Sequence, residues 1–113
     1  MEIVHAEYQV HYDEANSIVS CKGSFRLHGE EYKPILDLLL KAADAVPALL
    51  TLDVRDLQFL NSSGINTLSK FILHVRNHKV TQVVVQGSAR FPWQEKSLIN
   101  LQRLLPALKL EIA

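Results

Sequence analysis

The spacing of apolar residues changes repeatedly along this chain, and that alternation limits the folds that it can adopt. Between residues 6 and 12 every second residue is apolar, whereas from residue 32 the apolar positions recur every three or four residues. A period of two is typical of a strand with one buried face, and a period near 3.6 is typical of an amphipathic helix. The chain is therefore predicted to belong to the α/β class.

Two strands are predicted at the start of the chain, over residues 6–12 and 18–21. Residues 13–16, Asp-Glu-Ala-Asn, are typical of a turn, so the two strands are expected to form a hairpin. Gly23 and the serine after it are expected to end the second strand and to release the chain into a connector.

Further along, helices and strands alternate. Helices are predicted from about Tyr32 to Pro47, from about Ser63 to His78 and over Leu98–Leu105, and strands are predicted at Leu49–Val54, Gln82–Gln86 and Leu108–Ile112. The nearly continuous apolar run 49–54 is expected to be covered on both faces, and a loop is expected over 55–60. The resulting order, β-β-α-β-α-β-α-β, implies a mixed sheet with parallel pairs and helices packed against one or both faces.

Length and composition indicate one globular domain, residues 1–113. With 48% hydrophobic residues and a formal net charge of zero, the chain differs from disordered proteins. It has no run of five basic residues, so we expect no nucleic-acid partner. No apolar run reaches the roughly 20 residues that cross a bilayer, and the N-terminus does not read as a signal peptide. A cytoplasmic protein without membrane insertion is therefore predicted.

Three small polar residues and a glycine interrupt the apolar pattern at Asn61, Ser62, Ser63 and Gly64, where the second helix is predicted to begin. Asn61 or Ser62 can cap the free N–H groups of that helix. Gly64 removes bulk from the first turn, so another backbone or a ligand can come close. Capping alone accounts for these residues. A second interpretation is that an exposed hydroxyl accepts a phosphate, which the free N–H groups and the helix dipole would favour.

The stretch from Leu50 to Phe71 resembles the STAS domain, a family named for sulfate transporters and anti-sigma-factor antagonists. Residues 50–54, Leu-Thr-Leu-Asp-Val, are similar to the family's central strand, and residues 61–64 are similar to its Asp-Ser-Ser-Gly motif, with Asn61 in place of Asp. By element order the resemblance covers essentially the whole chain. It implies a single STAS domain that binds other proteins and is not an enzyme.

In antagonists of this type, the resemblance implies, the unphosphorylated form binds a serine-kinase anti-sigma factor and so frees a sigma factor. The kinase phosphorylates the first serine of the motif, here Ser62, and a PP2C-like phosphatase removes the phosphate. Asn61, Ser62, Ser63 and Gly64 would then be partner-binding residues, with no cofactor. Two alternatives stay open: an unphosphorylated STAS scaffold or transporter-associated subunit, and a small α/β enzyme or ligand-binding domain that uses the serine pair.

One apolar residue is a further candidate for partner binding. Leu73 lies on the helix face opposite Ile65, Leu68 and Val75, so it is either a partner contact or an ordinary exposed leucine. Trp93 is expected to pack under the third helix.

Other chemistries find less support. His74 and His78 are four residues apart and could bind one metal ion, but no carboxylate or thiol at helical spacing completes the set, so no metal site is predicted. Ser62, a histidine and Asp53 could form a hydrolase triad on paper, but Asp53 is better explained as the end of a buried strand. Cys21 lies in an apolar alternation, where a buried and inert thiol is expected.

Overall fold

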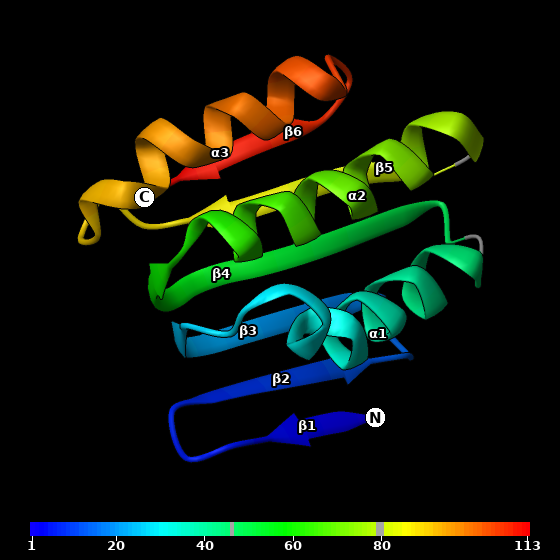
Figure 1. Cartoon of the computed structure of the whole chain (residues 1–113). Helices are drawn as coiled ribbons and strands as arrows, with labels where there is room; N and C mark the ends of the chain where they lie inside the picture. Colours follow the sequence, from blue (N-terminus) through cyan, green and yellow to red (C-terminus); the bar gives the residue numbers. More distant parts are fainter. Residues whose placement is uncertain (46, 79–80) are drawn as a thin grey trace.

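The described part of the chain, residues 1–45, 47–78 and 81–113 of a computed structural model, forms a six-stranded sheet and three α-helices (Figure 1). In chain order the elements are β1 Glu2–Val4, β2 Tyr8–Asp13, β3 Ile18–Phe25, the 3-10 helix η1 Gly29–Tyr32, α1 Lys33–Asp44, β4 Leu49–Leu60, α2 Ser62–His78, β5 Gln82–Gly87, α3 Pro92–Leu104 and β6 Lys109–Ile112. The predicted class and element order are confirmed. The short strand β1 is an addition that the sequence did not indicate.

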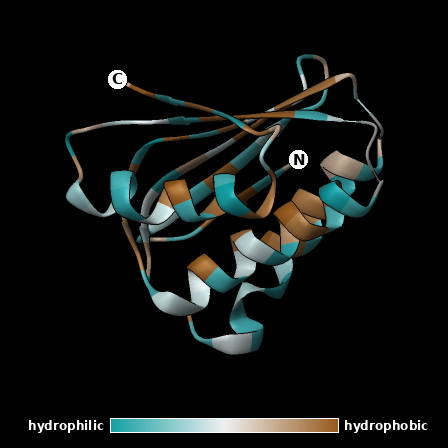
Figure 2. Cartoon of the chain, turned by 90° about the horizontal axis from the view of Figure 1, so that it is seen from above, coloured by the Kyte–Doolittle hydropathy of each residue, from teal (hydrophilic) through white to brown (hydrophobic). Residues whose placement is uncertain are grey.

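The six strands lie in the sheet in the same order as in the chain. β1, β2 and β3 are antiparallel neighbours, and every pair from β3 to β6 is parallel. A connection between parallel strands is almost always right-handed. Since the sheet grows in one direction without reversal, all three crossover helices fall on the same face, as Figure 2 shows. The core lies between that face and the helices.

The expectation that the strand starting at Leu49 is covered on both faces is wrong. Leu50, Leu52 and Val54 are buried beneath the helices, but the alternate residues Thr51 and Asp53 are only partly buried on the face without helices. A short apolar run does not distinguish the two arrangements when Thr51 and Asp53 are its only polar residues.

Both β3 and β4 are longer than predicted. Gly23 does not end β3, which continues to Phe25; its φ of 88° and its close approach to the Glu7 carbonyl oxygen leave no room for a side chain. The predicted loop 55–60 is also wrong, because β4 continues to Leu60 and pairs with β3 as far as Phe25 and Leu60.

The second half of β4 is held on its other edge by side chains from the start of α3, because β5 pairs with β4 only as far as Asp53. The fully buried Gln94 donates to the carbonyl oxygens of Val54 and Leu57 over 2.7 and 3.0 Å. Trp93 donates its ring N–H to the Leu57 carbonyl over 3.1 Å and packs against the core. These contacts take the place of a neighbouring strand.

None of the described helices has the length and apolar character needed to cross a membrane. Cys21 is buried, as predicted, and burial raises the pKa of its thiol from 9.0 to about 12.

Candidate regulatory site at the start of the second helix

The residues of the Asn-Ser-Ser-Gly motif lie at the edge of the sheet where β3 and β4 end and α2 begins (Figure 1). The last register pair of the two strands is Phe25 and Leu60, and the N–H of Asn61 donates to the Phe25 carbonyl oxygen over 3.3 Å. The motif is therefore positioned by the sheet and lies beside the connector between β3 and η1.

Asn61 makes three side-chain hydrogen bonds at this edge. Its Oδ1 accepts the N–H of Gly64 over 2.9 Å, which is the N-cap interaction predicted from the sequence. The same oxygen accepts the hydroxyl of Tyr32 over 2.6 Å, and Nδ2 donates to the carbonyl oxygen of Leu27 over 2.7 Å. Asn61 therefore joins α2 to both the connector and η1.

The donated hydrogen bond distinguishes asparagine from aspartate here. As caps the two residues are equivalent, and on that ground alone the exchange would be expected to be neutral. A carboxylate, however, would face the Leu27 carbonyl oxygen and could not donate to it. Burial raises the pKa of Tyr32 to about 12, so its hydroxyl stays protonated and donates to Asn61.

Ser62 and Ser63 lie in different environments. Ser62 is exposed at the first position of the 17-residue helix α2, and within the described chain its hydroxyl has no hydrogen-bond partner. Ser63 is partly buried, and its Oγ accepts the N–H of Gly29 over 3.3 Å. The carbonyl oxygen of Ser63 accepts the hydroxyl of Thr67 over 3.0 Å. Only the first serine of the pair presents an uncommitted hydroxyl.

Gly64 is buried in the first turn of α2, as its lack of bulk suggested. A Cβ at this position would lie 2.8 Å from the Tyr32 hydroxyl oxygen and would collide with the side chain of Leu60. The neighbours that need the space are thus two side chains of the protein itself.

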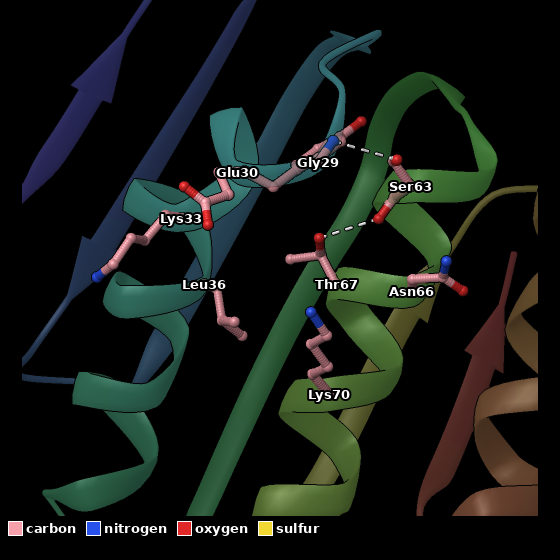
Figure 3. Close-up of a pocket in the computed structure, with 9 residues that line it drawn as sticks. Gly29, Glu30, Lys33, Leu36, Ser63, Asn66, Thr67 and Lys70 are labelled. Atoms are coloured by element: carbon pink, nitrogen blue, oxygen red, sulfur yellow. Dashed lines mark hydrogen bonds between the residues drawn. The ribbon is translucent and has the colours of Figure 1, made fainter.

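A groove of about 360 Å³ lies beside the motif, between η1 and α1 on one side and α2 on the other (Figure 3). It is lined by Gly29, Glu30, Tyr32, Lys33, Leu36, Ser63, Asn66, Thr67 and Lys70. The ammonium of Lys33 pairs with Asp37 at 3.0 Å, whereas Lys70 has no ion pair within the described chain. This groove was not predicted from the sequence, although its α2 residues recur at i, i+3, i+4 and i+7, which places them on one face of the helix.

Only the comparison with solved structures finds proteins similar to this chain. No protein-family model matches the chain, and no curated protein matches it either. Among solved structures, one chain of the complex of the diguanylate cyclase SiaD with its activator SiaC from Pseudomonas aeruginosa matches with a TM-score of 0.75 and 14% identity. The match covers 100% of the present chain and 99% of the chain in the complex. SiaC of P. aeruginosa matches with a TM-score of 0.66 and 15% identity, over 100% and 94% of the two chains. Apo-SiaC from the same organism matches with a TM-score of 0.65 and 14% identity, over 99% and 96%.

This chain has the fold of SiaC.

Within this SiaC fold, the predicted partner contact Leu73 is partly buried and lies on α2 eleven residues after Ser62. Eleven residues of α-helix span about 16 Å and about three turns, so Leu73 is on the same side of the helix as Ser62 but is not adjacent to it.

His74 and Asp53, which were considered from the sequence as a metal ligand and as a member of a triad, contact other side chains in the structure. Nε2 of His74 lies 2.8 Å from Oδ1 of Asp44, and the side chain of His78 is outside the described part of the chain. The described residues contain no cluster of three potential metal ligands. Asp53 lies within β4 and not at its end. Partial burial acts to raise the pKa of Asp53, but hydrogen bonds from Arg55 outweigh it and hold the pKa below its usual range.

Proposed function

We propose that this chain is a non-enzymatic regulator of the STAS type, which acts by binding a protein partner and is switched by phosphorylation of Ser62. The observation that carries the proposal is the exposed, unpartnered hydroxyl of Ser62 at the first position of α2. Its neighbours Asn61 and Ser63 both have hydrogen-bond partners. The STAS-like motif and the SiaC fold support the same function.

A phosphate on Ser62 is compatible with this fold. The free N–H groups of the first turn and the positive end of the helix dipole favour an anion at this position. The phosphate would add a charge of about −1.5 to −2 to a protein whose formal net charge is zero. A change of this size on the surface alters the affinity for a partner without a rearrangement of the core.

The proposed partners are a serine-kinase anti-sigma factor, which binds the unphosphorylated form and phosphorylates Ser62, and a PP2C-like phosphatase, which removes the phosphate. The structural comparison favours a second kind of partner as well. SiaC is the activator of the diguanylate cyclase SiaD. An effector enzyme of that class is therefore a second candidate partner for this chain, which we place in the cytoplasm together with the kinase.

The proposed partner-binding residues differ in how they can contribute. Ser62 is exposed, and Asn61, Ser63 and Leu73 are partly buried, so these four residues can contact a partner directly. Gly64 is buried beneath Tyr32 and Leu60, and we assign it the role of positioning the first turn of α2.

The proposal is tested by incubating the protein with a candidate kinase and ATP and locating the phosphate by mass spectrometry. Ser62→Ala is the informative variant, and Ser63→Ala is the matched control at the next position. We expect phosphate on Ser62 in the wild type and in Ser63→Ala, and none in Ser62→Ala. A protein that binds its partner but carries no phosphate on Ser62 even after incubation with kinase and ATP would instead be an unphosphorylated scaffold or transporter-associated subunit. Turnover of a substrate bound at the serine pair would identify an enzyme.

A further inference from the structure

A bulge in β4 turns Phe59 outward immediately before the motif. Leu57 pairs with Gly23 and Phe59 pairs with Ser24, so Gln58 is an extra residue on β4. Leu57 and Leu60 are therefore both buried, and Phe59 is 39% exposed. With strict alternation from Leu57, the phenylalanine would have pointed into the core. Bulges often redirect a side chain next to a functional site.

The exposed ring of Phe59 is covered by a guanidinium group. Cζ of Arg26 lies 5.1 Å from the centre of the ring, a distance typical of a cation–π contact. Within the described chain, Arg26 has no hydrogen bond or ion pair from its side chain. Its N–H donors are thus available to an anion.

Arg26 also lies beside the residue that precedes Ser62. The carbonyl oxygens on either side of it, those of Phe25 and Leu27, both accept hydrogen bonds from Asn61, over 3.3 and 2.7 Å. Arg26 is therefore opposite Asn61 at the end of the β3–β4 pair. Ser62 follows Asn61 directly and opens α2. A phosphate on Ser62 would therefore lie one residue beyond the position opposite Arg26, where the long arginine side chain can approach it.

We propose that Arg26 binds the phosphate of phosphorylated Ser62, and that this contact draws its guanidinium away from the ring of Phe59. The inference rests on the proposed function, because it takes Ser62 as the phosphorylated residue. Arginine binds phosphate through two parallel hydrogen bonds, an interaction stronger than a cation–π contact at an exposed site. Phosphorylation would then change the shape of the surface around Ser62 as well as its charge, by uncovering Phe59.

Other charged or titratable groups lie on the segment packed against the start of α2, and the experiment has to separate Arg26 from them. They are His28, Glu30, Glu31 and Tyr32, and Oε1 of Glu31 accepts the N–H of His28 over 3.0 Å. All four stay the same when only Arg26 is changed. A comparison of Arg26 variants therefore isolates the contribution of its guanidinium.

The test uses phosphoserine installed at position 62 by genetic-code expansion, so that no kinase is needed. The second pKa of the phosphate is measured by phosphorus NMR in the wild type, in Arg26→Gln and Arg26→Lys, and in the control Arg55→Gln. Arg55 is an exposed arginine on β4 that pairs with Asp53. We expect the phosphate pKa to be lower in the wild type than in Arg26→Gln by about half a unit, and this difference to shrink in 1 M salt. Arg26→Lys should fall between the two, and Arg55→Gln should match the wild type.

Equal phosphate pKa values in the wild type and Arg26→Gln would overturn the inference. So would equal effects of Arg26→Gln and Arg55→Gln, because these would show a general dependence on net charge. Either result leaves the proposed function intact, since the phosphoserine is installed without a kinase. Conversely, a protein that no kinase phosphorylates would remove the proposed function, and the contact between Arg26 and the installed phosphate would still be measurable.

Discussion

Tyr32 donates its hydroxyl hydrogen to Oδ1 of Asn61 over 2.6 Å, and this bond ties the end of η1 to the residue that caps α2. The amide nitrogen of the same asparagine donates to the carbonyl oxygen of Leu27. One side chain thus joins the start of α2 to Leu27 and Tyr32, which lie 34 and 29 residues earlier in the sequence. The first residue of the motif therefore has a structural role that depends on its being an amide.

Asn61→Asp should lower the free energy of unfolding by about 1–3 kcal/mol, because the carboxylate cannot donate to Leu27 and leaves that carbonyl oxygen without its partner. The favourable interaction of the new charge with the helix dipole would offset part of this loss, about 0.3–1 kcal/mol. Urea denaturation measures the effect. The control is Asn66→Asp, an exposed position in the same helix, where we expect a change within about 0.5 kcal/mol. Equal stabilities of wild type and Asn61→Asp would contradict the role assigned to the amide.

Ser62→Asp should change the stability by less than about 1 kcal/mol, because aspartate is tolerated in the first turn and interacts favourably with the helix dipole. Ser62→Lys places the opposite charge at the same exposed position and should be the less stable of the two. Thermal unfolding in low salt and in 1 M salt tests the cause, since the difference should disappear when salt screens it. If the proposed function holds, Ser62→Asp should also bind a cognate kinase more weakly than the wild type.

Gln94→Leu should destabilise the protein by about 3 kcal/mol, since it removes the donors to the Val54 and Leu57 carbonyls and the acceptor of the Ser88 N–H, all in a buried setting. Because β4 leads directly into Ser62, we expect increased amide hydrogen exchange in residues 54–60 of the variant. Gln58→Leu is the control, an exposed glutamine on the same strand. An unchanged exchange rate over 54–60 would show that the strand does not depend on α3.

Cys21 should make the protein less stable at high pH. Burial raises the pKa of its thiol in the folded state from 9.0 to about 12, so the folded state holds its proton when the unfolded state has lost it. The contribution of the protonated thiol to the free energy of unfolding is complete below pH 9 and is lost as the pH rises from 9 towards 12. Urea denaturation at pH 8 and pH 10.5 should show a larger loss for the wild type than for Cys21→Ala. In the same way, an alkylating reagent should react with the thiol only after unfolding.

Local patterns in the sequence were enough to place α2 and to predict its cap. The apolar residues Ile65, Leu68 and Ile72 recur at helical spacing, and the capping bond from Asn61 to Gly64 spans only three residues. These features depend on neighbours in the chain, which is why the helix was predicted to within one residue of its observed start.

Features that depend on distant residues could not be predicted. The second half of β4 lacks regular alternation because its register with β3 shifts twice, once between Asp53 and Asp56 and once at Gln58. Its edge is satisfied by side chains about 36 to 40 residues later, at Trp93 and Gln94. The contacts of Asn61 with Leu27 and Tyr32 likewise link segments 34 and 29 residues apart. The groove beside Ser63 requires the same two segments to meet.

The hydrogen bonds from α3 to β4 also set the order in which the protein can mature during its synthesis. The ribosome synthesises β4 and α2 before Trp93 and Gln94. Until these two residues have been added, the carbonyl oxygens of Val54 and Leu57 lack their hydrogen-bond donors. A nascent chain that stops before residue 91 would carry the complete Asn-Ser-Ser-Gly sequence on a strand that is not yet fully held. The finished surface around Ser62 therefore forms only after Trp93 and Gln94 have been synthesised, and a kinase that requires this surface would not recognise a shorter nascent chain.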